Sequence, residues 1–188
     1  MRPNGPETAL TARSMRAFIV ALALLAVLLI DGAPVRAGEA LAATRPLGKA
    51  DRVVVEKAAK RMHLMQGEAI LKTYTIALGR YAEGHKEEQG DSRTPEGRYW
   101  LDGRNARSNF YKAIRVTYPN EDDIARARER GVKPGGNIMI HGLANGWSAR
   151  ALGHPALNWT RGCIAVTNRE MDEIWAAVDD GTPIDILP

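Results

Sequence analysis

Apolar residues recur at short intervals over residues 52–79 and predict three consecutive β-strands. The runs at 53–57, 61–66 and 69–79 are rich in β-branched and aromatic residues, which favour strands. Gln66-Gly67-Glu68 separates the second run from the third and has the composition of a turn. Because strands that follow closely in sequence usually pair with each other, we expect an antiparallel meander.

Two further segments predict helices in the C-terminal half. Asn120 precedes a segment at 121–130 that begins with acidic residues, continues with arginines and ends at Gly131, as capped helices do. Thr167 and Glu170 have the spacing of a capping box, and the apolar positions after them recur at helical intervals. Additional strands are predicted at 98–102, 137–140, 163–166 and 183–187, the last at a sheet edge. We therefore expect a mainly β protein with two short helices.

The N-terminus has the layout of a secretory signal peptide. Arginines precede an apolar run of 14 residues at 17–30, and a small-residue site follows at 35–37. A span of the bilayer needs about 20 apolar residues, so cleavage is favoured over anchoring, although an uncleaved signal would give a transient membrane association. We divide the chain into a signal peptide at 1–37 (with Met15 as an alternative start), a linker at 38–50 and one domain at 51–188.

The net charge and the cysteine content restrict the classes of function that the chain can have. The chain has 188 residues and a net charge of +4, which falls to +2 once residues 1–37 are removed. Such a small excess, without a basic run, argues against a nucleic-acid partner. Cys163 is the single cysteine, and an exported chain enters an oxidising space where cysteines normally pair. Cys163 is therefore a buried inert thiol, half of an intermolecular disulfide, or a reactive group.

The surroundings of Cys163 favour a nucleophile. A cysteine attacks as the thiolate and needs a neighbouring base, which His141, at the end of a predicted strand, could supply. Gly162 lacks a Cβ, which would let a substrate carbonyl approach backbone N–H groups beside the thiol. His154, followed by a proline, is expected to be a loop residue. His141, His154 and Cys163 lack the paired spacing of zinc ligands, so we expect no metal.

The same residues form part of a longer, ordered set of motifs. His141-Gly142 is followed by a loop and then by Thr160-Arg161-Gly162-Cys163-Ile164. Further along the chain in both directions lie a strand ending in glycine at 74–79, the segment Thr94-Pro95-Glu96-Gly97-Arg98-Tyr99, and Asn168 with Glu170. This pattern resembles the L,D-transpeptidase catalytic domain family (YkuD type) from about residue 52 to the C-terminus. The resemblance implies a β-sandwich or barrel-like arrangement of mixed sheets.

The resemblance also implies a function. Members act in the bacterial periplasm or cell envelope on peptidoglycan stem peptides, with no cofactor. Cys163 would attack the carbonyl before a terminal D-Ala, release D-Ala and pass the acyl group to an amine, which gives a 3–3 cross-link. His141 would be the general base, the Gly142 carbonyl would fix its tautomer, and backbone N–H groups around Gly162 would hold the oxyanion.

Two positions of the motif around Cys163 differ from the residues that are usual in the family. Many members have histidine where this chain has Arg161, and arginine where it has Ala165. Because a guanidinium pairs well with a carboxylate, Arg161, together with Thr160, is predicted to contact the substrate. A murein peptide hydrolase using the same cysteine and histidine (a carboxypeptidase, endopeptidase or lipoprotein-releasing enzyme) stays open, as does a non-catalytic wall-binding module.

Overall fold

The computed structural model describes residues 47–188. The predicted signal peptide, the alternative start at Met15 and most of the predicted linker lie outside these residues. The described elements, in chain order, are β1 (Arg52–Glu56), β2 (Arg61–Gln66), β3 (Ala69–Thr75), β4 (Gly97–Asn105), β5 (Ala113–Val116), α2 (Glu121–Glu129), β6 (Met139–His141), α3 (Ala149–Leu152), β7 (Ile164–Ala165), α4 (Asn168–Ala177) and β8 (Thr182–Leu187).

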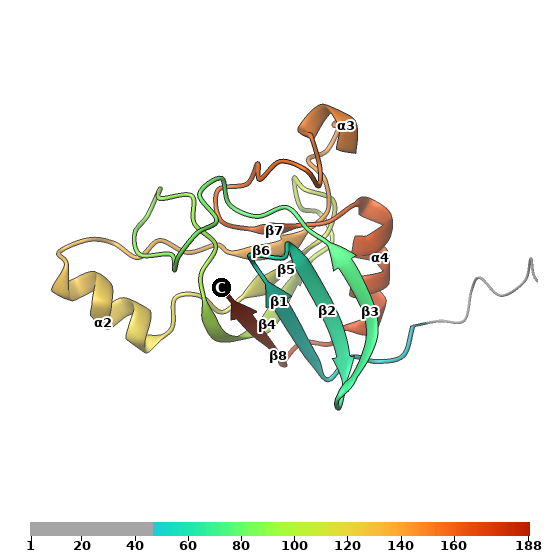
Figure 1. The fold of residues 1–188 in the computed structure, drawn as a ribbon, viewed down its shortest axis with the longest axis horizontal. Coiled ribbons are helices and arrows are strands. Elements are labelled where there is room, and N and C mark those ends of the chain that lie inside the picture. Colours follow the sequence, from blue (N-terminus) through green and yellow to red (C-terminus); the bar gives the residue numbers. More distant parts are fainter. Residues whose placement is uncertain (1–46) are drawn as a thin grey trace, which may run out of the picture. The chain divides into compact units, whose positions relative to one another are not determined.

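All eight strands belong to one mixed sheet, with the order β3-β2-β1-β8-β4-β5-β6-β7 (Figure 1). The β1–β8 and β6–β7 pairs are parallel, and the other neighbours are antiparallel. The predicted mainly β class and the β1–β3 meander are therefore confirmed. The described part of the chain has one more helical segment than predicted, the single turn α3, which Ser148 caps by accepting a hydrogen bond from the Ala151 N–H.

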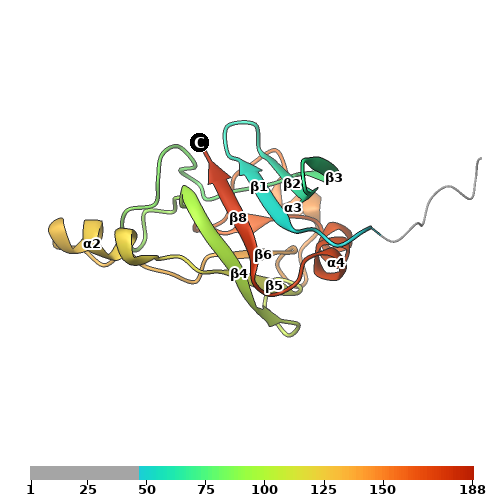
Figure 2. The ribbon, with the colours of Figure 1, turned by 90° about the horizontal axis from the view of Figure 1, so that it is seen from below.

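The two ends of the sheet are joined by the chain that follows β3. The backbone N–H of Ala77 donates to the carbonyl of Ala165 in β7 at 2.9 Å, and the N–H of Ala165 donates back to Ala77 at 2.8 Å. Gly79 then bridges to Thr160. The sheet therefore curls, as the second view also shows (Figure 2), and encloses a core that includes Tyr74, Tyr99, Met62, Leu64, Ile140 and Met171. The barrel-like expectation is confirmed.

The predicted edge position of the last strand is wrong. Strand β8 lies in the middle of the sheet, parallel to β1 and antiparallel to β4. Pro183 suggested an edge because proline lacks the N–H that a ladder needs. In the structure Pro183 faces Trp100 of β4, and the pairing with β1 begins only at Ile184, so the missing N–H falls outside the β1 ladder.

Both predicted helix caps are present. Asn120 and Asp123 form a reciprocal capping box at the start of α2, and Thr167 and Glu170 form another at the start of α4. Helix α4 contributes Met171 and Ile174 to the core beneath the sheet. Because α4 follows β7 after two residues, this packing fixes the strand that begins directly after Cys163.

Two residues of the predicted linker pack against the rest of the described chain. Ala50 is buried, and its N–H donates to the carbonyl of Ala177 at 2.9 Å. Leu47 also packs against the core. Within residues 47–188, no helix combines the length and the apolar character needed to cross a bilayer.

Candidate active site

The register of β6 and β7 brings Cys163 and His141 to one region of the sheet. The strands are parallel, with Ile140 beside Ile164 and His141 beside Ala165. Cys163 directly precedes β7, so it lies one strand across and two residues back from His141. Side chains alternate along a strand, which assigns both residues to the same face, with roughly 8 Å between their Cα atoms at standard strand spacings. Residues 22 positions apart in sequence thus become neighbours.

The imidazole of His141 is held as a neutral base. Its Nδ1 lies 2.6 Å from the carbonyl oxygen of Gly142. Since a carbonyl only accepts hydrogen bonds, Nδ1 carries the proton and Nε2 keeps a free lone pair. Burial lowers the pKa of His141 to about 4, against the smaller raising effect of the Gly142 carbonyl. The contact between His141 and Gly142 expected from the sequence is therefore present.

Gly142 is required at its position by close packing. A Cβ there would lie 2.8 Å from both the Asn168 Oδ1 and the Tyr111 carbonyl oxygen. Asn168 Oδ1 also accepts a hydrogen bond from the Leu143 N–H at 2.9 Å. The chain leaving His141 is thus fixed by the first residue of α4 and by the loop before β5.

Two aromatic rings enclose His141. Phe110 lies with its ring centroid 4.6 Å from the imidazole, and Trp159 lies at 5.8 Å with an edge-on geometry. His141 is only 3% exposed as a result. The sequence analysis named neither ring as part of the site, since Phe110 lies in a polar loop without a local pattern and Trp159 in the loop before Cys163. Trp147, the other tryptophan of this region, is exposed.

The thiol of Cys163 is protonated in the resting site. Burial raises its pKa above the ordinary value, and a hydrogen bond from the Met139 backbone and the charge of Lys86 lower it by less. The Sγ atom lies 3.5 Å from the carbonyl oxygen of Asn137, to which the thiol can donate. Cys163 and His141 therefore form a neutral pair, so a proton has to move as the sulfur attacks a carbonyl.

The turn before Cys163 is closed by Thr160. Its hydroxyl donates to the Cys163 carbonyl at 2.8 Å and accepts from the Gly162 N–H at 3.1 Å. Thr160 is also only 5% exposed. Thr160 was predicted to contact the substrate; in the structure its hydroxyl makes both of these hydrogen bonds within the turn. Thr160 therefore orders the segment that presents the thiol.

Gly162 has a different structural reason from the one inferred from sequence. Its φ is +129°, and a Cβ would lie 2.6 Å from the carbonyl oxygen of Arg93. The glycine therefore permits a close contact between two backbone segments rather than leaving open space for a substrate. Its N–H already donates to Thr160, so this group is not free for an oxyanion in the resting site.

The two unusual positions of the motif have distinct environments. Arg161 is exposed, and no ion pair to it is found among the described residues. Ala165 is fully buried, and both of its backbone groups pair with Ala77. The position where many family members have arginine is thus part of the seam that closes the sheet.

His154 also reaches the edge of this region. It lies in the loop after α3, as expected, but it is only 9% exposed. Its ring centroid is 6.5 Å from that of Trp159, whose ring is also a neighbour of His141. Its Nδ1 has no hydrogen-bond partner within residues 47–188. Burial lowers the pKa of His154.

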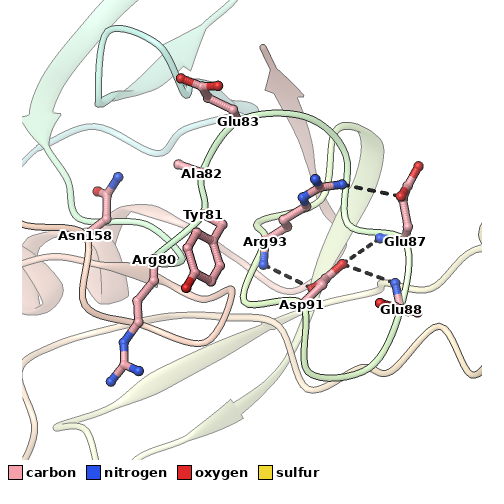
Figure 3. Close-up of a pocket in the computed structure, with 9 residues that line it drawn as sticks. All are labelled: Arg80, Tyr81, Ala82, Glu83, Glu87, Glu88, Asp91, Arg93 and Asn158. Atoms are coloured by element: carbon pink, nitrogen blue, oxygen red, sulfur yellow. Dashed lines mark hydrogen bonds and ion pairs between the residues drawn. The ribbon is translucent and has the colours of Figure 1, made fainter.

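The long loop between β3 and β4 packs against the turn that carries Cys163. Asp91 organises it by accepting backbone N–H groups from Glu87, Glu88 and Arg93 at 2.8, 3.1 and 3.0 Å (Figure 3). The buried ammonium of Lys86 donates to the same carboxylate at 2.6 Å. Arg93 is the residue whose carbonyl contacts Gly162, so this network holds the loop against the turn that carries the thiol.

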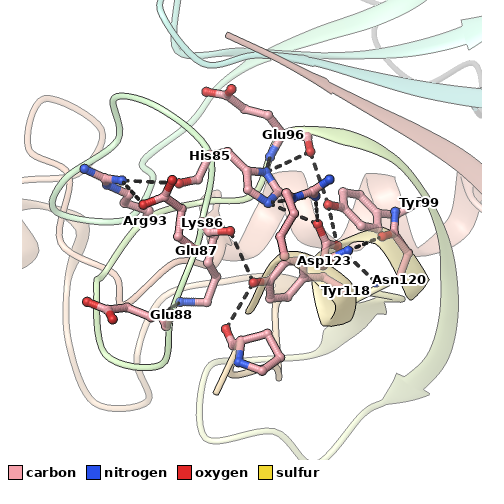
Figure 4. A network of polar contacts seen from close by, with 12 residues as sticks. His85, Lys86, Glu87, Glu88, Arg93, Glu96, Tyr99, Tyr118, Asn120 and Asp123 are labelled. Atoms are coloured by element: carbon pink, nitrogen blue, oxygen red, sulfur yellow. Dashed lines mark hydrogen bonds and ion pairs between the residues drawn. The ribbon is translucent and has the colours of Figure 1, made fainter. Parts of the chain in front are cut away.

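A second network ties this loop to α2. The buried Asp123 carboxylate accepts hydrogen bonds from the Tyr99 hydroxyl at 2.9 Å and the Asn120 N–H at 3.0 Å, and His85 Nε2 lies 3.0 Å from it (Figure 4). Burial raises the pKa of Asp123, but the hydrogen bonds from His85, the Asn120 backbone and Tyr99 outweigh it and give a pKa below the ordinary value. The network therefore depends on an ionised Asp123.

Comparison with known proteins identifies close similarity to one family. A family model described as the L,D-transpeptidase catalytic domain (YkuD) matches residues 50–186. A protein of Escherichia coli K12 named "Putative L,D-transpeptidase YafK" is 31% identical over 121 residues, which are 62% of this chain and 42% of that protein. This chain thus spans about two fifths of the length of that curated relative.

Solved structures share the fold. The helical cell shape determining protein Pgp2 of Campylobacter jejuni is 26% identical, with a TM-score of 0.51, over 75% of this chain and 50% of that one. Bd1075 of Bdellovibrio bacteriovorus is 24% identical, with a TM-score of 0.51, over 77% of this chain and 50% of that one. At these identities, the arrangement of the strands is the shared feature.

Proposed function

Because this chain belongs to the L,D-transpeptidase catalytic domain family, we propose that it is an exported enzyme of the bacterial cell envelope that acts on the stem peptides of peptidoglycan. The family match over residues 50–186 supports peptide substrates from the cell wall. The signal-like segment at 1–37 supports a periplasmic location. The reaction we propose is acyl transfer through a cysteine thioester.

In the proposed first half-reaction, Cys163 Sγ attacks the carbonyl carbon that joins the L-centre of the third stem residue to the terminal D-Ala. The thiol proton passes to Nε2 of His141 as the C–S bond forms. The C–N bond then breaks, and His141 returns the proton to the leaving amine, so that D-Ala departs as the free amino acid. The enzyme is left as a thioester on Cys163.

In the second half-reaction, an amine of a neighbouring stem peptide attacks the thioester. His141 takes a proton from the amine as the new amide forms, and it returns this proton to the departing sulfur. The product is a 3–3 cross-link. The oxyanion of each step would be held by backbone N–H groups beside the sulfur; we favour that of Cys163, since that of Gly162 is used by Thr160.

The single observation that carries this proposal is the combination of strand register and tautomer at His141. The parallel β6–β7 pair brings His141 and Cys163 to one face, and the Gly142 carbonyl fixes the proton on Nδ1. Nε2 is therefore the base. A pKa of about 4 keeps that base unprotonated at neutral pH, which is the state needed to accept a proton from a thiol.

Recognition of the substrate is proposed to include Arg161. Arg161 is exposed two residues before the thiol in sequence, and the described residues offer it no ion pair. A stem-peptide carboxylate could pair with this guanidinium.

Product analysis tests the proposal. The purified protein is incubated with a disaccharide tetrapeptide, and the products are weighed by mass spectrometry. We expect free D-Ala and a cross-linked dimer, with both lost in Cys163→Ala. Free D-Ala with a trimmed tripeptide and no dimer would instead indicate the hydrolase, in which water replaces the amine. If neither product forms, the chain is not an acyl-transfer enzyme on this substrate, and a wall-binding role is favoured.

A further inference from the structure

The peptide group that joins Gly142 to Leu143 connects His141 to helix α4. Its carbonyl oxygen lies 2.6 Å from Nδ1 of His141 and accepts a hydrogen bond from this nitrogen. Its N–H group, on the opposite side of the same peptide plane, donates to Oδ1 of Asn168 at 2.9 Å. Asn168 is the first residue of α4. One peptide group is therefore hydrogen-bonded to the candidate base on one side and to the helix on the other.

The backbone of Gly142 does not by itself fix the orientation of this peptide. Packing requires a glycine there, since a Cβ would lie 2.8 Å from both the Asn168 Oδ1 and the Tyr111 carbonyl oxygen. A residue without a Cβ, however, meets few steric barriers to rotation about its own φ and ψ. The peptide plane that follows Gly142 can therefore turn over unless its hydrogen bonds hold it.

The other hydrogen bonds of this segment hold the preceding peptide. The N–H of Gly142 donates to the Tyr111 carbonyl at 3.1 Å, and the carbonyl of His141 accepts the Val166 N–H at 3.0 Å. Both groups belong to the peptide between His141 and Gly142. In the described part of the chain, the next peptide, between Gly142 and Leu143, has no partners other than the imidazole and the side chain from α4. That side chain is therefore its anchor.

A reversal of this peptide plane would exchange the two tautomers of His141. In the observed orientation a carbonyl faces Nδ1, so Nδ1 carries the proton and Nε2 is the free base. In the reversed orientation the Leu143 N–H would face Nδ1. Because an N–H group only donates, Nδ1 would then accept, and the proton would lie on Nε2. An Nε2 that already carries a proton cannot take one from the thiol.

We propose that Asn168 is a positioning residue of the active site, which holds the Gly142–Leu143 peptide in the orientation that makes Nε2 of His141 the base. The inference rests on the proposed function, since it concerns the base of that reaction. The Leu143 N–H only donates, so the amide oxygen of Asn168 is the atom that faces it. The oxygen is therefore the required group, and an aspartate should be able to replace the asparagine.

Helix α4 also holds the loop on the other side of Gly142. Asp172, one turn after Asn168, accepts hydrogen bonds from the Tyr111 hydroxyl at 2.9 Å and from the Lys112 ammonium at 2.6 Å. Residues four positions apart lie on the same face of a helix. One face of α4 therefore binds both segments that flank Gly142, which gives Asn168 a fixed place relative to the peptide.

Two substitutions at residue 168 test the role of the oxygen. Asn168→Ala removes the acceptor, and Asn168→Asp keeps one. Neither should disturb α4, because Thr167 and Glu170 form its capping box, alanine has a high helix propensity and aspartate suits the first turn. Asn158→Ala is the matched control, since the Asn158 Oδ1 accepts the Leu78 N–H at 3.1 Å in a hydrogen bond that is also part-buried.

The tautomer is measured at neutral pH from the 15N chemical shifts of the imidazole nitrogens, in protein labelled at histidine. The signals of His141 are assigned by their loss in His141→Gln. The unchanged protein, Asn168→Asp and Asn158→Ala should have the proton on Nδ1, whereas Asn168→Ala should show it distributed between Nδ1 and Nε2. The signals of the other three histidines should not change.

The rate at which a carbapenem acylates the thiol provides the second measurement. Asn168→Ala should lower this rate about tenfold, as expected for the loss of roughly one hydrogen bond. Asn168→Asp should recover most of the rate, because it restores the acceptor. A residue that only stabilised the fold would lower the free energy of unfolding without moving the proton of His141.

The inference is overturned if the proton stays on Nδ1 in Asn168→Ala, if Asn158→Ala shifts the tautomer as much, or if Asn168→Asp loses as much rate as Asn168→Ala. Release of D-Ala from a disaccharide tetrapeptide by the unchanged protein is measured in parallel. If D-Ala is released but the tautomer does not depend on Asn168, the inference fails and the proposed function stands. If the tautomer depends on Asn168 but no D-Ala is released, the inference stands and the proposed function fails.

Discussion

Replacement of Thr160 by valine tests whether this hydroxyl orders the turn that presents the thiol. Valine keeps the shape of threonine but removes both hydrogen bonds, the one donated to the Cys163 carbonyl at 2.8 Å and the one accepted from the Gly162 N–H at 3.1 Å. The bond to the Gly162 N–H is buried, so water cannot replace the hydroxyl there, whereas the bond to the Cys163 carbonyl is part-buried. The Gly162 N–H is then left unsatisfied, and the Cys163 carbonyl loses its partner within the protein.

The magnitude follows from the cost of unsatisfied buried groups. A buried unsatisfied group costs about 1–3 kcal/mol and a part-buried one less, so we expect Thr160→Val to lower the free energy of unfolding by about 2–4 kcal/mol. For a domain of this size, 1 kcal/mol corresponds to roughly 2–4 °C in Tm. The expected shift is therefore about 4–16 °C. Because the same bonds hold Cys163, the rate of acylation should also fall.

Urea unfolding measures the stability, and thiol acylation by a carbapenem measures the activity. Thr160→Ser keeps the hydroxyl and serves as the control, with a loss limited to that of one methyl group, about 1 kcal/mol. Equal unfolding free energies for the valine and serine variants would refute the reasoning. In that case, a rise in KM for the stem peptide alone would favour the contact with substrate that the sequence suggested.

Three further predictions concern neighbouring residues. Gly162→Ala should lower the free energy of unfolding by about 2–5 kcal/mol, because its Cβ would meet the Arg93 carbonyl at 2.6 Å. Gly146→Ala, whose Cβ would have nothing within 4 Å, should cost only its backbone strain. Equal losses of the two variants in urea unfolding would contradict this. The acylation rate should stay level from about pH 5 to 8 and fall at lower pH as His141 is protonated near its pKa of about 4. His141→Gln should lower this rate about a hundredfold. A pH profile, measured by stopped flow, in which the rate falls already near pH 6.5 would argue against a buried neutral base. The pKa of Asp123 is lowered in the folded protein, so its stabilising effect is complete above the unfolded pKa of about 3.9 and is lost as the pH falls through the lower folded pKa. Asp123→Asn should therefore make the free energy of unfolding depend less steeply on pH on the acid side. An unchanged slope would count against the network.

Local signals in the sequence predicted much of the fold. The strands of the meander and both capping boxes depend on residues close to each other in sequence, and the structure has them. Strand β5, with the residues Ala-Ile-Arg-Val, was not predicted, because four residues give too little alternation to stand out from a loop.

Long-range pairing could not be predicted from these signals. The central place of β8 depends on pairing with β1, about 130 residues earlier in the chain. The seam between Ala77 and Ala165, which closes the sheet, involves two small residues without a pattern of their own. Pairings of this kind are decided by the packing of the whole core.

In the candidate active site, too, local features were predicted and long-range contacts were not. The contact between His141 and the Gly142 carbonyl joins adjacent residues and was expected. The reason why Gly162 is a glycine could not be expected from the sequence. The space of its Cβ is occupied by the carbonyl of Arg93, which lies in a loop about 70 residues earlier. The role of Thr160 within the turn and the cover provided by Phe110 likewise became visible only in three dimensions.

Covalent capture of the nucleophile tests the central claim most directly. The protein is incubated with a carbapenem, whose strained carbonyl acylates an activated thiol, and the intact mass is measured. The account predicts a mass gain of one carbapenem per chain at Cys163, absent in Cys163→Ala and formed much more slowly in His141→Gln. No adduct on the unchanged protein, or an adduct that persists in Cys163→Ala, would contradict it.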